Sequence, residues 1–325
     1  MRKTICVLAG LILFIAVQGQ KTSNGISVIK GERFNVIRSL KDLKPDPLLN
    51  PRVTRDLNGS LIKKTWKDTI IDYGTKASGD PVVQKVPFLP KNLLSELKFT
   101  DEEKKEIFRN FENSMSQNYQ DLAALKYSGF KQGGFFVEFG ACDGIKLSNS
   151  FLLEKEYGWK GILAEPVKDW QSDLEMNRSA RIFNLAVTNR SNDRIEMLVS
   201  ESLEVSSLAE FNEDYLSDYR SKHSRVEYVE TISLNDLLLQ GNAPNDIDFL
   251  SIDTEGNEFQ ILESFNFEGY SFAFISIEHN NNNNNRNRIQ ELLESKGYEK
   301  VHQNISSVDD WYVPNPLSKI MPKTF

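Results

Sequence analysis

The stretch GFFVEFGACDG holds the first residues whose types and spacing could do chemistry. Residues 135–139 form a short apolar run, typical of a strand buried on both faces of a parallel sheet. Glu138 stands near the carboxyl end of that run, and Gly140, Asp143 and Gly144 follow it. Glycines let the backbone turn sharply and approach a ligand closely, and the first N–H groups of a following helix face the same crevice. Open α/β sheets bind ligands at this place, so the stretch predicts a binding loop.

A second apolar run, GILAEP, ends in Glu165. The interval from Gly140 to Glu165 suits a strand–helix–strand unit, with a helix over residues 147–157 that Gly158 ends. In such units an acid at the end of the second strand accepts hydrogen bonds from both ribose hydroxyls of a nucleoside cofactor. A surface carboxylate before a proline is the alternative interpretation. The glycine turn upstream favours ribose binding.

Two further apolar runs also end in acids. IDFLSIDTEGNE carries Asp253 and Glu255, and FAFISIEHN carries Glu278 and His279. Acids that stand repeatedly where a buried strand stops are what a cleft needs. A neutral imidazole is suited to accept a proton at neutral pH, so His279 is a candidate general base, with one of the acids to orient it or the acceptor. A hydrogen-bonded structural histidine at a strand end is the other interpretation.

The remaining expected elements position these strand ends. A capping box at Thr100 (TDEE) starts one helix, or two with a break near Ser116, ahead of the first strand. Ser233 caps another helix start. The other predicted segments are strands over residues 180–187, 194–199, 229–234, 298–303 and 310–313, helices over residues 257–265 and 289–296, and an asparagine loop over residues 280–285. The last two strands are close enough in sequence to pair as an antiparallel hairpin.

The composition is that of a soluble globular protein, with 325 residues of which 39% are hydrophobic and 26% charged. A formal net charge of -7 argues against nonspecific binding to nucleic acid or anionic membranes. Cys6 lies in an N-terminal segment that processing would remove, so no disulfide with Cys142 is expected in the mature chain. The histidines are far apart and no Cys/His zinc spacing exists, so the sequence predicts no metal site.

Residues 1–19 are typical of a secretory signal, with a basic start, an apolar run and a small-residue cleavage site at VQG. The apolar run is too short to cross a hydrocarbon core of about 30 Å comfortably, which favours a cleaved signal over a short signal-anchor. Either form predicts a secretory or extracytoplasmic protein, and the anchor would add membrane association through the N-terminus. A cytoplasmic protein is the alternative. Residues 20–99, with recurring prolines, predict an irregular stem or extension, and residues 100–325 the main domain.

A set of motifs occurs in the following order: the glycine stretch, LSNSFLLEKEYGWKGILAEP, VETISLNDLL, IDFLSIDTEGNEFQIL, ISIEHN, LLESKGY and DDWYV. Together they resemble the FkbM-type methyltransferase family, and SQNYQDLAAL upstream is similar to that family's lead-in. The resemblance implies a class I, Rossmann-like fold that uses S-adenosylmethionine, in which a mostly parallel seven-stranded sheet has helices on both faces and a C-terminal antiparallel hairpin. The implied activity is methyl transfer to a hydroxyl of a sugar or another small or lipid-linked acceptor.

The resemblance also implies roles for individual residues. The cofactor-binding positions that it implies are Glu138, Gly140, Asp143, Gly144, Glu165, Ala186 and Asp253. Ala186 would lie where the third strand passes the adenine. The catalytic positions that it implies are His279, Asp253, Glu255 and Glu278. The chain departs from the family's pattern at Phe139 and Cys142 and in the asparagines that follow Asn280.

Two functions from other classes stay open on the sequence. A secretory-pathway glycosyltransferase would use Asp253 and Glu255 to hold a divalent metal on a nucleotide-sugar diphosphate. A binding or trafficking protein of the secretory pathway would keep the fold without turnover. The glycine loop followed by Glu165 favours an adenosyl cofactor over a nucleotide sugar. The expected partners are a small-molecule or glycan acceptor and no nucleic acid.

Overall fold

The structure is a computed structural model in which the chain divides into two compact units, residues 1–95 and 96–325. In the second unit it describes residues 96–316 except 111–112, 215, 280–281 and 307. In the first unit it describes Leu93 and strand segments between residues 6 and 87. Most of the expected signal segment, residues 1–19, lies outside the described residues, and the boundaries expected at residues 19 and 99 stay predictions.

The first unit contains short antiparallel strands, two of them in the expected signal segment and the others where the sequence predicted an irregular extension. They are β1 (Cys6–Leu8), β2 (Leu11–Leu13), β3 (Gln20–Lys21), β4 (Ile26–Gly31), β5 (Phe34–Ser39), β6 (Lys44–Pro45), β7 (Val53–Arg55), β8 (Leu61–Lys64), β9 (Thr69–Thr75) and β10 (Pro81–Pro87). The pairings are β1 with β2, β3 with β4 and β5, β6 with β7 and β8, and β9 with β10. Ile and Val recur in these segments, and such β-branched residues favour strands. Across the described residues of the chain, no helix has the length and apolar character that a membrane crossing requires.

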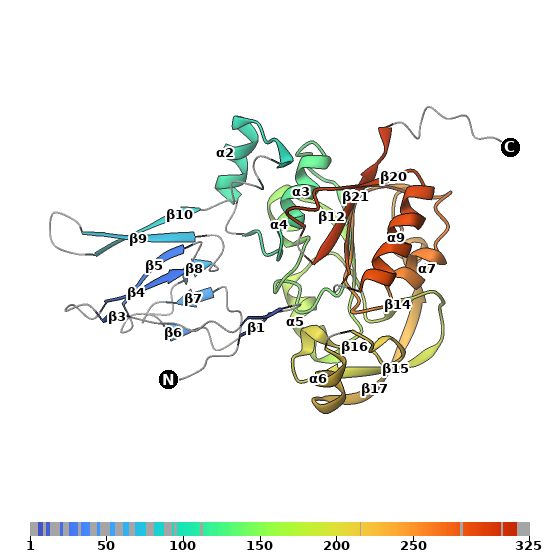
Figure 1. The fold of residues 1–325 in the computed structure, drawn as a ribbon. Coiled ribbons are helices and arrows are strands. Elements are labelled where there is room, and N and C mark those ends of the chain that lie inside the picture. The colour runs from blue at the N-terminus through green and yellow to red at the C-terminus, as the bar shows by residue number, and fades with distance from the viewer. Residues whose placement is uncertain are drawn as a thin grey trace. The chain divides into compact units, whose positions relative to one another are not determined.

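A mixed seven-stranded sheet forms the centre of the second unit (Figure 1). In spatial order its strands are β13 (Arg181–Phe183), β12 (Lys160–Ala164), β11 (Phe135–Phe139), β18 (Asp246–Ile252), β19 (Ser271–Glu278), β21 (Asp309–Pro314) and β20 (Tyr298–Val301). Neighbouring strands from β13 to β19 pair parallel, whereas β21 pairs antiparallel with both β19 and β20. The chain order reverses between β11 and β18, so the loops after these two strands meet at the switch point where α/β sheets bind ligands.

Helices cover both faces of this sheet, as the sequence predicted. One face packs against α7 (Leu234–Gln240), α8 (Glu258–Glu263) and α9 (Asn283–Ser295). The other face carries α3 (Gln120–Tyr127), α4 (Phe151–Tyr157) and α5 (Lys168–Asn177). Figure 1 shows α7 and α9 on one side of the sheet and α3 and α4 on the other. Strands β11, β12 and β18 are buried over nearly their whole length because both of their faces are covered.

A second, four-stranded sheet corrects the predicted third strand. Its strands are β14 (Ala186–Thr188), β17 (Ser224–Ser233), β15 (Arg194–Ser200) and β16 (Ser207–Leu208). The single strand predicted over residues 180–187 is therefore two strands, β13 and β14, in different sheets. The Phe183 carbonyl accepts the Glu165 N–H (3.0 Å), and the polar Asn184 interrupts the apolar run directly afterwards. The chain then leaves the first sheet, and Ala186 pairs parallel with Thr231.

Helix starts and ends follow the predicted signals in part. The Thr100 capping box is confirmed, because the Thr100 N–H donates to Glu103 Oε2 (2.6 Å) and the Glu103 N–H donates to Thr100 Oγ1 (3.2 Å). Helix α2 (Asp101–Asn110) ends well before α3, so the expected break lies between them. Helix α4 begins later than predicted because Leu147 takes a positive φ of 59°. The Ser233 cap is also confirmed, since its hydroxyl accepts the Asp236 N–H (3.2 Å).

The asparagines over residues 283–285 are helical, which corrects this part of the predicted loop over residues 280–285. Asn282 is the N-cap of α9, and its side chain accepts the Asn285 N–H (3.3 Å). Asparagine is among the best N-cap residues because its short side chain reaches the free N–H groups of the first helical turn. The helix that the sequence placed over residues 289–296 therefore begins at Asn283. The first two asparagines of the run lie outside the described residues.

Candidate functional site

The glycines after β11 are fixed by close contacts inside the protein. Gly140 has φ +71°, and a Cβ there would overlap the carbonyl oxygen of Asp253. Gly144 has φ +82°, and a Cβ there would overlap Arg178 and Leu174 of the α5 region. The loops after β11 and β18 therefore touch backbone to backbone, and only glycine fits at both places.

We expect Gly140→Ala to destabilise the protein more than Gly158→Ala. Both positions have positive φ, near +71° and +62°, but nothing lies within 4 Å of a Cβ at Gly158. Gly158→Ala should therefore cost only the backbone strain of about 1–2 kcal/mol, whereas Gly140→Ala adds an overlap worth about 1–3 kcal/mol. Chemical denaturation of the two variants measures the difference. Equal destabilisation would show that the loops separate without cost.

Glu138 is held inside the protein by the segment after the glycine loop. Its carboxylate accepts hydrogen bonds from the Asn149 N–H (2.6 Å) and from the hydroxyls of Ser148 (3.0 Å) and Ser150. Arg178 Nη1 lies 3.8 Å from the same carboxylate. The sequence placed Glu138 at the cofactor, whereas the structure commits it to shaping the loop that would surround the cofactor.

Arg178 stands behind the glycine loop, and the sequence alone did not identify it as a site residue. Its guanidinium donates to Glu154 Oε2 (2.9 Å), to the Gly144 carbonyl (3.1 Å) and to the hydroxyls of Ser148 (3.1 Å) and Ser150 (2.8 Å). The side chain is fully buried. It joins α4, the end of α5 and the glycine loop through charge-assisted hydrogen bonds, which are stronger than neutral ones.

Glu165 lies against the glycine loop, where the sequence expected it. Its Oε2 accepts the Cys142 N–H (2.9 Å) and its Oε1 accepts the Val167 N–H (2.8 Å). Burial raises the pKa of Glu165 to about 7, against the effect of these two N–H donors. Each oxygen keeps one further lone pair, so the carboxylate can still accept two hydroxyl donors.

Two other expected cofactor residues are placed differently. Asp143 turns its carboxylate back to its own loop, where Oδ1 accepts the N–H groups of Ile145 (2.8 Å) and Lys146 (2.6 Å). Ala186 is buried in β14 of the second sheet and packs against Val167 and neighbouring apolar side chains. Asp143 therefore fixes the turn, and Ala186 lies in the smaller sheet and not in the third strand of the main one.

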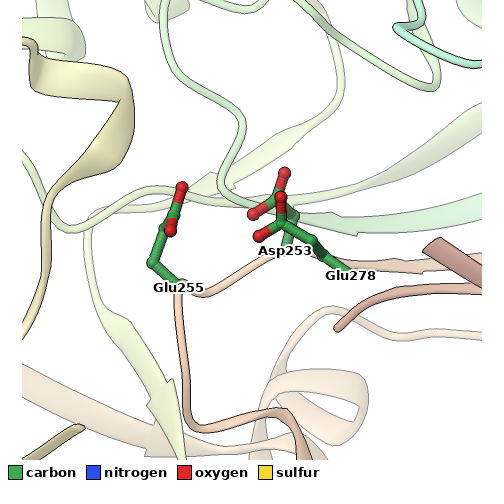
Figure 2. A group of neighbouring side chains, drawn as sticks. All are labelled: Asp253, Glu255 and Glu278. Atoms are coloured by element: carbon green, nitrogen blue, oxygen red, sulfur yellow. The ribbon is translucent and has the colours of Figure 1, made fainter. Parts of the chain in front are cut away.

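Three of the predicted catalytic acids come together at the carboxyl ends of β18 and β19. Figure 2 shows the carboxyl groups of Asp253 and Glu278 side by side, with Glu255 next to them. Carboxylate oxygens of the three residues lie within 4.8 Å of one another. Such a group of oxygen ligands could hold a divalent cation, although the sequence predicted no metal site. Without a cation, like charges this close and this buried favour shared protons.

The ionisation of Asp253 and Glu278 is linked. Burial raises the pKa of Asp253 to about 6, while a hydrogen bond from Glu278 favours its charged form. Burial, and then the charge of Asp253, raises the pKa of Glu278 well above the ordinary range. Glu278 is therefore the member of the pair that holds the shared proton, and it donates to the Asp253 carboxylate. This arrangement leaves one carboxylate that can accept a proton, held by a neutral neighbour.

Asp309 adds another acid to the same end of the sheet. Its Oδ2 accepts hydrogen bonds from the Ser276 hydroxyl (3.1 Å) and from the Gln120 amide at the start of α3. Burial raises the pKa of Asp309 to about 7, and the charge of Asp253 contributes. Gln120 and Asp309 lie in the motifs SQNYQDLAAL and DDWYV, so their place in those motifs was a signal that could have identified them.

His279 is not brought together with these acids. Glu278 is the last residue of β19 and shares a face with Ser276, whereas His279 follows the strand, and its backbone N–H donates to the Val308 carbonyl (3.0 Å). The charges that act on His279 come from Asp310, Arg286 and Lys300, and burial lowers the pKa of its imidazole. Asp310 accepts two hydrogen bonds from Arg286 (2.7 Å each) and one from Lys300 (2.8 Å), on the side of the sheet that α9 covers.

Comparison with known proteins identifies the family to which the chain belongs. A family model described as the methyltransferase FkbM domain matches residues 138–300. No curated protein matches the chain. Among solved structures the chain is similar to the crystal structure of methyltransferase FkbM from Methylobacillus flagellatus KT, at 11% identity and a TM-score of 0.37, over 64% of this chain and 60% of that one. The alignment thus spans less than two thirds of that protein. The family match covers half of the chain and both loops of the switch point, so the chain belongs to the FkbM methyltransferase family.

Proposed function

We propose that the protein is an S-adenosylmethionine-dependent methyltransferase that methylates a hydroxyl of a sugar or another small or lipid-linked acceptor. One observation carries the proposal: the buried Glu165 carboxylate, oriented by a glycine-loop N–H, stands beside the switch point where Asp253 and Glu278 meet. Family membership supports a methyltransferase, and the hydroxyl acceptor rests on the chemistry of the acid pair.

Glu165 and Asn149 fit two polar parts of S-adenosylmethionine, the ribose and the ammonium group. Glu165 can accept the two ribose hydroxyls, because each of its oxygens has one N–H partner and one free lone pair. Asn149 Oδ1 is buried and has no hydrogen-bond partner among the described residues, although its amide nitrogen donates to Ser251 Oγ (2.9 Å), two residues before Asp253. A buried acceptor without a donor is costly, so a ligand donor such as an ammonium group suits this place.

The chemistry at the acid pair follows from its ionisation. S-adenosylmethionine, when bound, supplies an electrophilic methyl group on a sulfonium. The chain has to hold an acceptor oxygen in line with that group and to take the hydroxyl proton as the new bond forms. Asp253 is the carboxylate that can receive the proton, and Glu278 keeps it in place by donating a hydrogen bond. We therefore assign the base to Asp253, and His279 becomes the alternative.

The rival functions have less support. A metal-dependent glycosyltransferase would use Asp253 and Glu255 as ligands, and the cluster has room for a cation. The interval from the glycine loop to Glu165 suits an adenosyl cofactor better than a nucleotide sugar. A binding or trafficking protein would retain cofactor affinity without turnover. We retain the secretory or extracytoplasmic location as a proposal from the N-terminal pattern, and an acceptor of the glycan type as a proposal from the family resemblance.

Calorimetric binding of S-adenosylhomocysteine to the full chain tests the proposal. We expect binding in the parent and a loss of about 10- to 100-fold in Glu165→Gln, because a hydrogen bond to a charged group contributes about 1.5–3 kcal/mol. Glu154→Gln is not a suitable control because it breaks the Arg178 network, so the exposed Glu263→Gln serves instead. A folded parent that binds no cofactor, but binds a nucleotide sugar with Mn²⁺, would overturn the proposal.

The pH dependence of S-adenosylhomocysteine binding follows from the ionisation of Glu165. Its pKa is raised from 4.5 to about 7 in the folded protein, so folding favours the protonated carboxyl. The stability that it contributes is therefore full below about pH 4.5 and is lost as pH rises through about 7. The cofactor's hydroxyls need the charged form as acceptor, so affinity should rise with pH up to about 7 and then level off. Glu165→Gln should remove this dependence.

A further inference from the structure

The segment between β15 and β17 reaches the reaction centre. Residues 201–223, the insert, contain η2 (Leu203–Val205), β16, η3 (Ala209–Phe211) and α6 (Ser217–Lys222). The insert contacts the loop after β18 at two places. Arg220 Nη2 donates to Glu255 Oε2 (2.6 Å), and the Phe211 carbonyl lies 2.9 Å from where a Cβ of Gly256 would stand.

Arg220 is fully buried and makes contacts in several directions. Its Nε donates to the Val205 carbonyl (2.6 Å), and its Nη1 donates to Asp214 Oδ1 (2.7 Å) and, more weakly, to Asn212 Oδ1 (3.4 Å). These partners all belong to the insert, whereas Glu255 belongs to the reaction centre. An arginine that loses all its water needs such a complete set of acceptors, and its planar fork holds each of them in a fixed direction.

Glu255 is held in an unusual conformation at this contact. Its φ is +59°, which is uncommon for a residue with a side chain, and Gly256 follows with φ +134°. Backbone strain of this kind persists only where the surroundings impose it, and it gathers at functional sites. The ion pair with Arg220 and the contact with Phe211 are the surroundings that do so here.

We propose that Arg220 is a positioning residue for methyl transfer, which fixes the Glu255 carboxyl group beside Asp253 and Glu278. This inference rests on the proposed function. Burial, together with the charges of Asp253, Asp214 and Glu258, raises the pKa of Glu255 well above its ordinary range, and Arg220 is the cation that opposes this shift. Loss of Arg220 would release the Glu255 side chain, so its oxygens would no longer lie at a fixed place near the cofactor's sulfonium.

The test compares Arg220→Met, Arg220→Lys and Glu255→Gln in the full chain. Carboxyl ¹³C NMR at a fixed pH of 7.5 reports the surroundings of the Glu255 carboxyl group, whose signal is identified by its loss in Glu255→Gln. Calorimetry gives the affinities for S-adenosylmethionine, which carries the sulfonium charge, and for S-adenosylhomocysteine, which lacks it. Arg225→Met, which removes a half-exposed arginine of β17, is the matched control.

We expect Arg220→Met to shift the Glu255 carboxyl signal and to reduce the preference for S-adenosylmethionine over S-adenosylhomocysteine at least fivefold at pH 7.5. Arg220→Lys keeps a donor to Glu255 and should restore most of both. Glu255→Gln leaves the insert in place and should reduce the preference for S-adenosylmethionine as Arg220→Met does. If Arg220→Met does not fold, Glu255→Gln tests whether the Glu255 carboxyl group sets this preference.

Two results would overturn the inference. An unchanged Glu255 carboxyl signal in folded Arg220→Met would mean that Arg220 does not position this group. An equal loss of affinity for both ligands would mean that Arg220 only stabilises the insert. A folded parent that binds neither ligand would instead contradict the proposed function, and a shifted Glu255 signal would then assign Arg220 to the folding of the insert alone.

Discussion

We expect Arg178→Met to lower the free energy of unfolding by about 3–5 kcal/mol, because it removes one partner of a buried ion pair. Arg178 is fully buried against Glu154, with 2.9 Å between Nε and Oε2. Without the guanidinium, burial would disfavour the charge on Glu154, whose pKa Arg178 helps to hold below its usual range. Methionine fills similar volume, so the change measures the lost charge and hydrogen bonds more than a cavity.

The same substitution should weaken cofactor binding. Arg178 donates to the Gly144 carbonyl and to two serine hydroxyls that also hold Glu138, so its loss loosens the loop that presents the Cys142 N–H to Glu165. Urea denaturation and calorimetry with S-adenosylhomocysteine measure the two effects. Arg225→Met, at an exposed ion pair, should change stability by less than about 1 kcal/mol. Equal effects of the two substitutions would show that the Arg178 network is dispensable.

Sequence periodicity was enough to place the strand ends. Buried runs of a parallel sheet are continuous and apolar, so an acid at the end of one stands out, as Glu165, Asp253 and Glu278 do. The order of the strands also brings these ends together, because the chain reverses direction across the sheet between β11 and β18. The three acids that meet in Figure 2 were therefore predictable as a group.

The sequence could not show contacts between residues that are far apart in the chain, or which side of the sheet a side chain occupies. Nothing local distinguishes Arg178 or Arg220 from a surface arginine, and each is buried in the structure by partners in other elements. Glu278 and His279 are adjacent in sequence, yet Glu278 is surrounded by the charges of Asp253, Glu255 and Asp309 and His279 by those of Asp310, Arg286 and Lys300. The asparagine run illustrates the same point, since the residues that suggested a loop are also good helix caps.

We expect Asp253→Asn to reduce methyl transfer by about 100- to 10,000-fold, the usual contribution of a general base, and His279→Gln to reduce it by less than about threefold. Asp253 is the carboxylate that remains charged in the pair with Glu278. Glu278→Gln should have an intermediate effect, because the amide can still donate a hydrogen bond to Asp253. Transfer of a tritiated methyl group to a panel of sugars and lipid-linked acceptors measures these rates.

A pH profile alone does not separate the two candidate bases. The pKa of Asp253 is raised to about 6, and burial lowers that of His279 from 6.5, so either base would give a rate that rises with pH through this region and then levels off. The substitutions separate them, and so does a measurement that needs no acceptor. Asp253→Asn removes a negative charge from the reaction centre and should lower the affinity for S-adenosylmethionine more than that for S-adenosylhomocysteine. His279→Gln should leave this preference unchanged, because the charges around His279 lie on the other side of the sheet; the opposite pattern would return the base to His279.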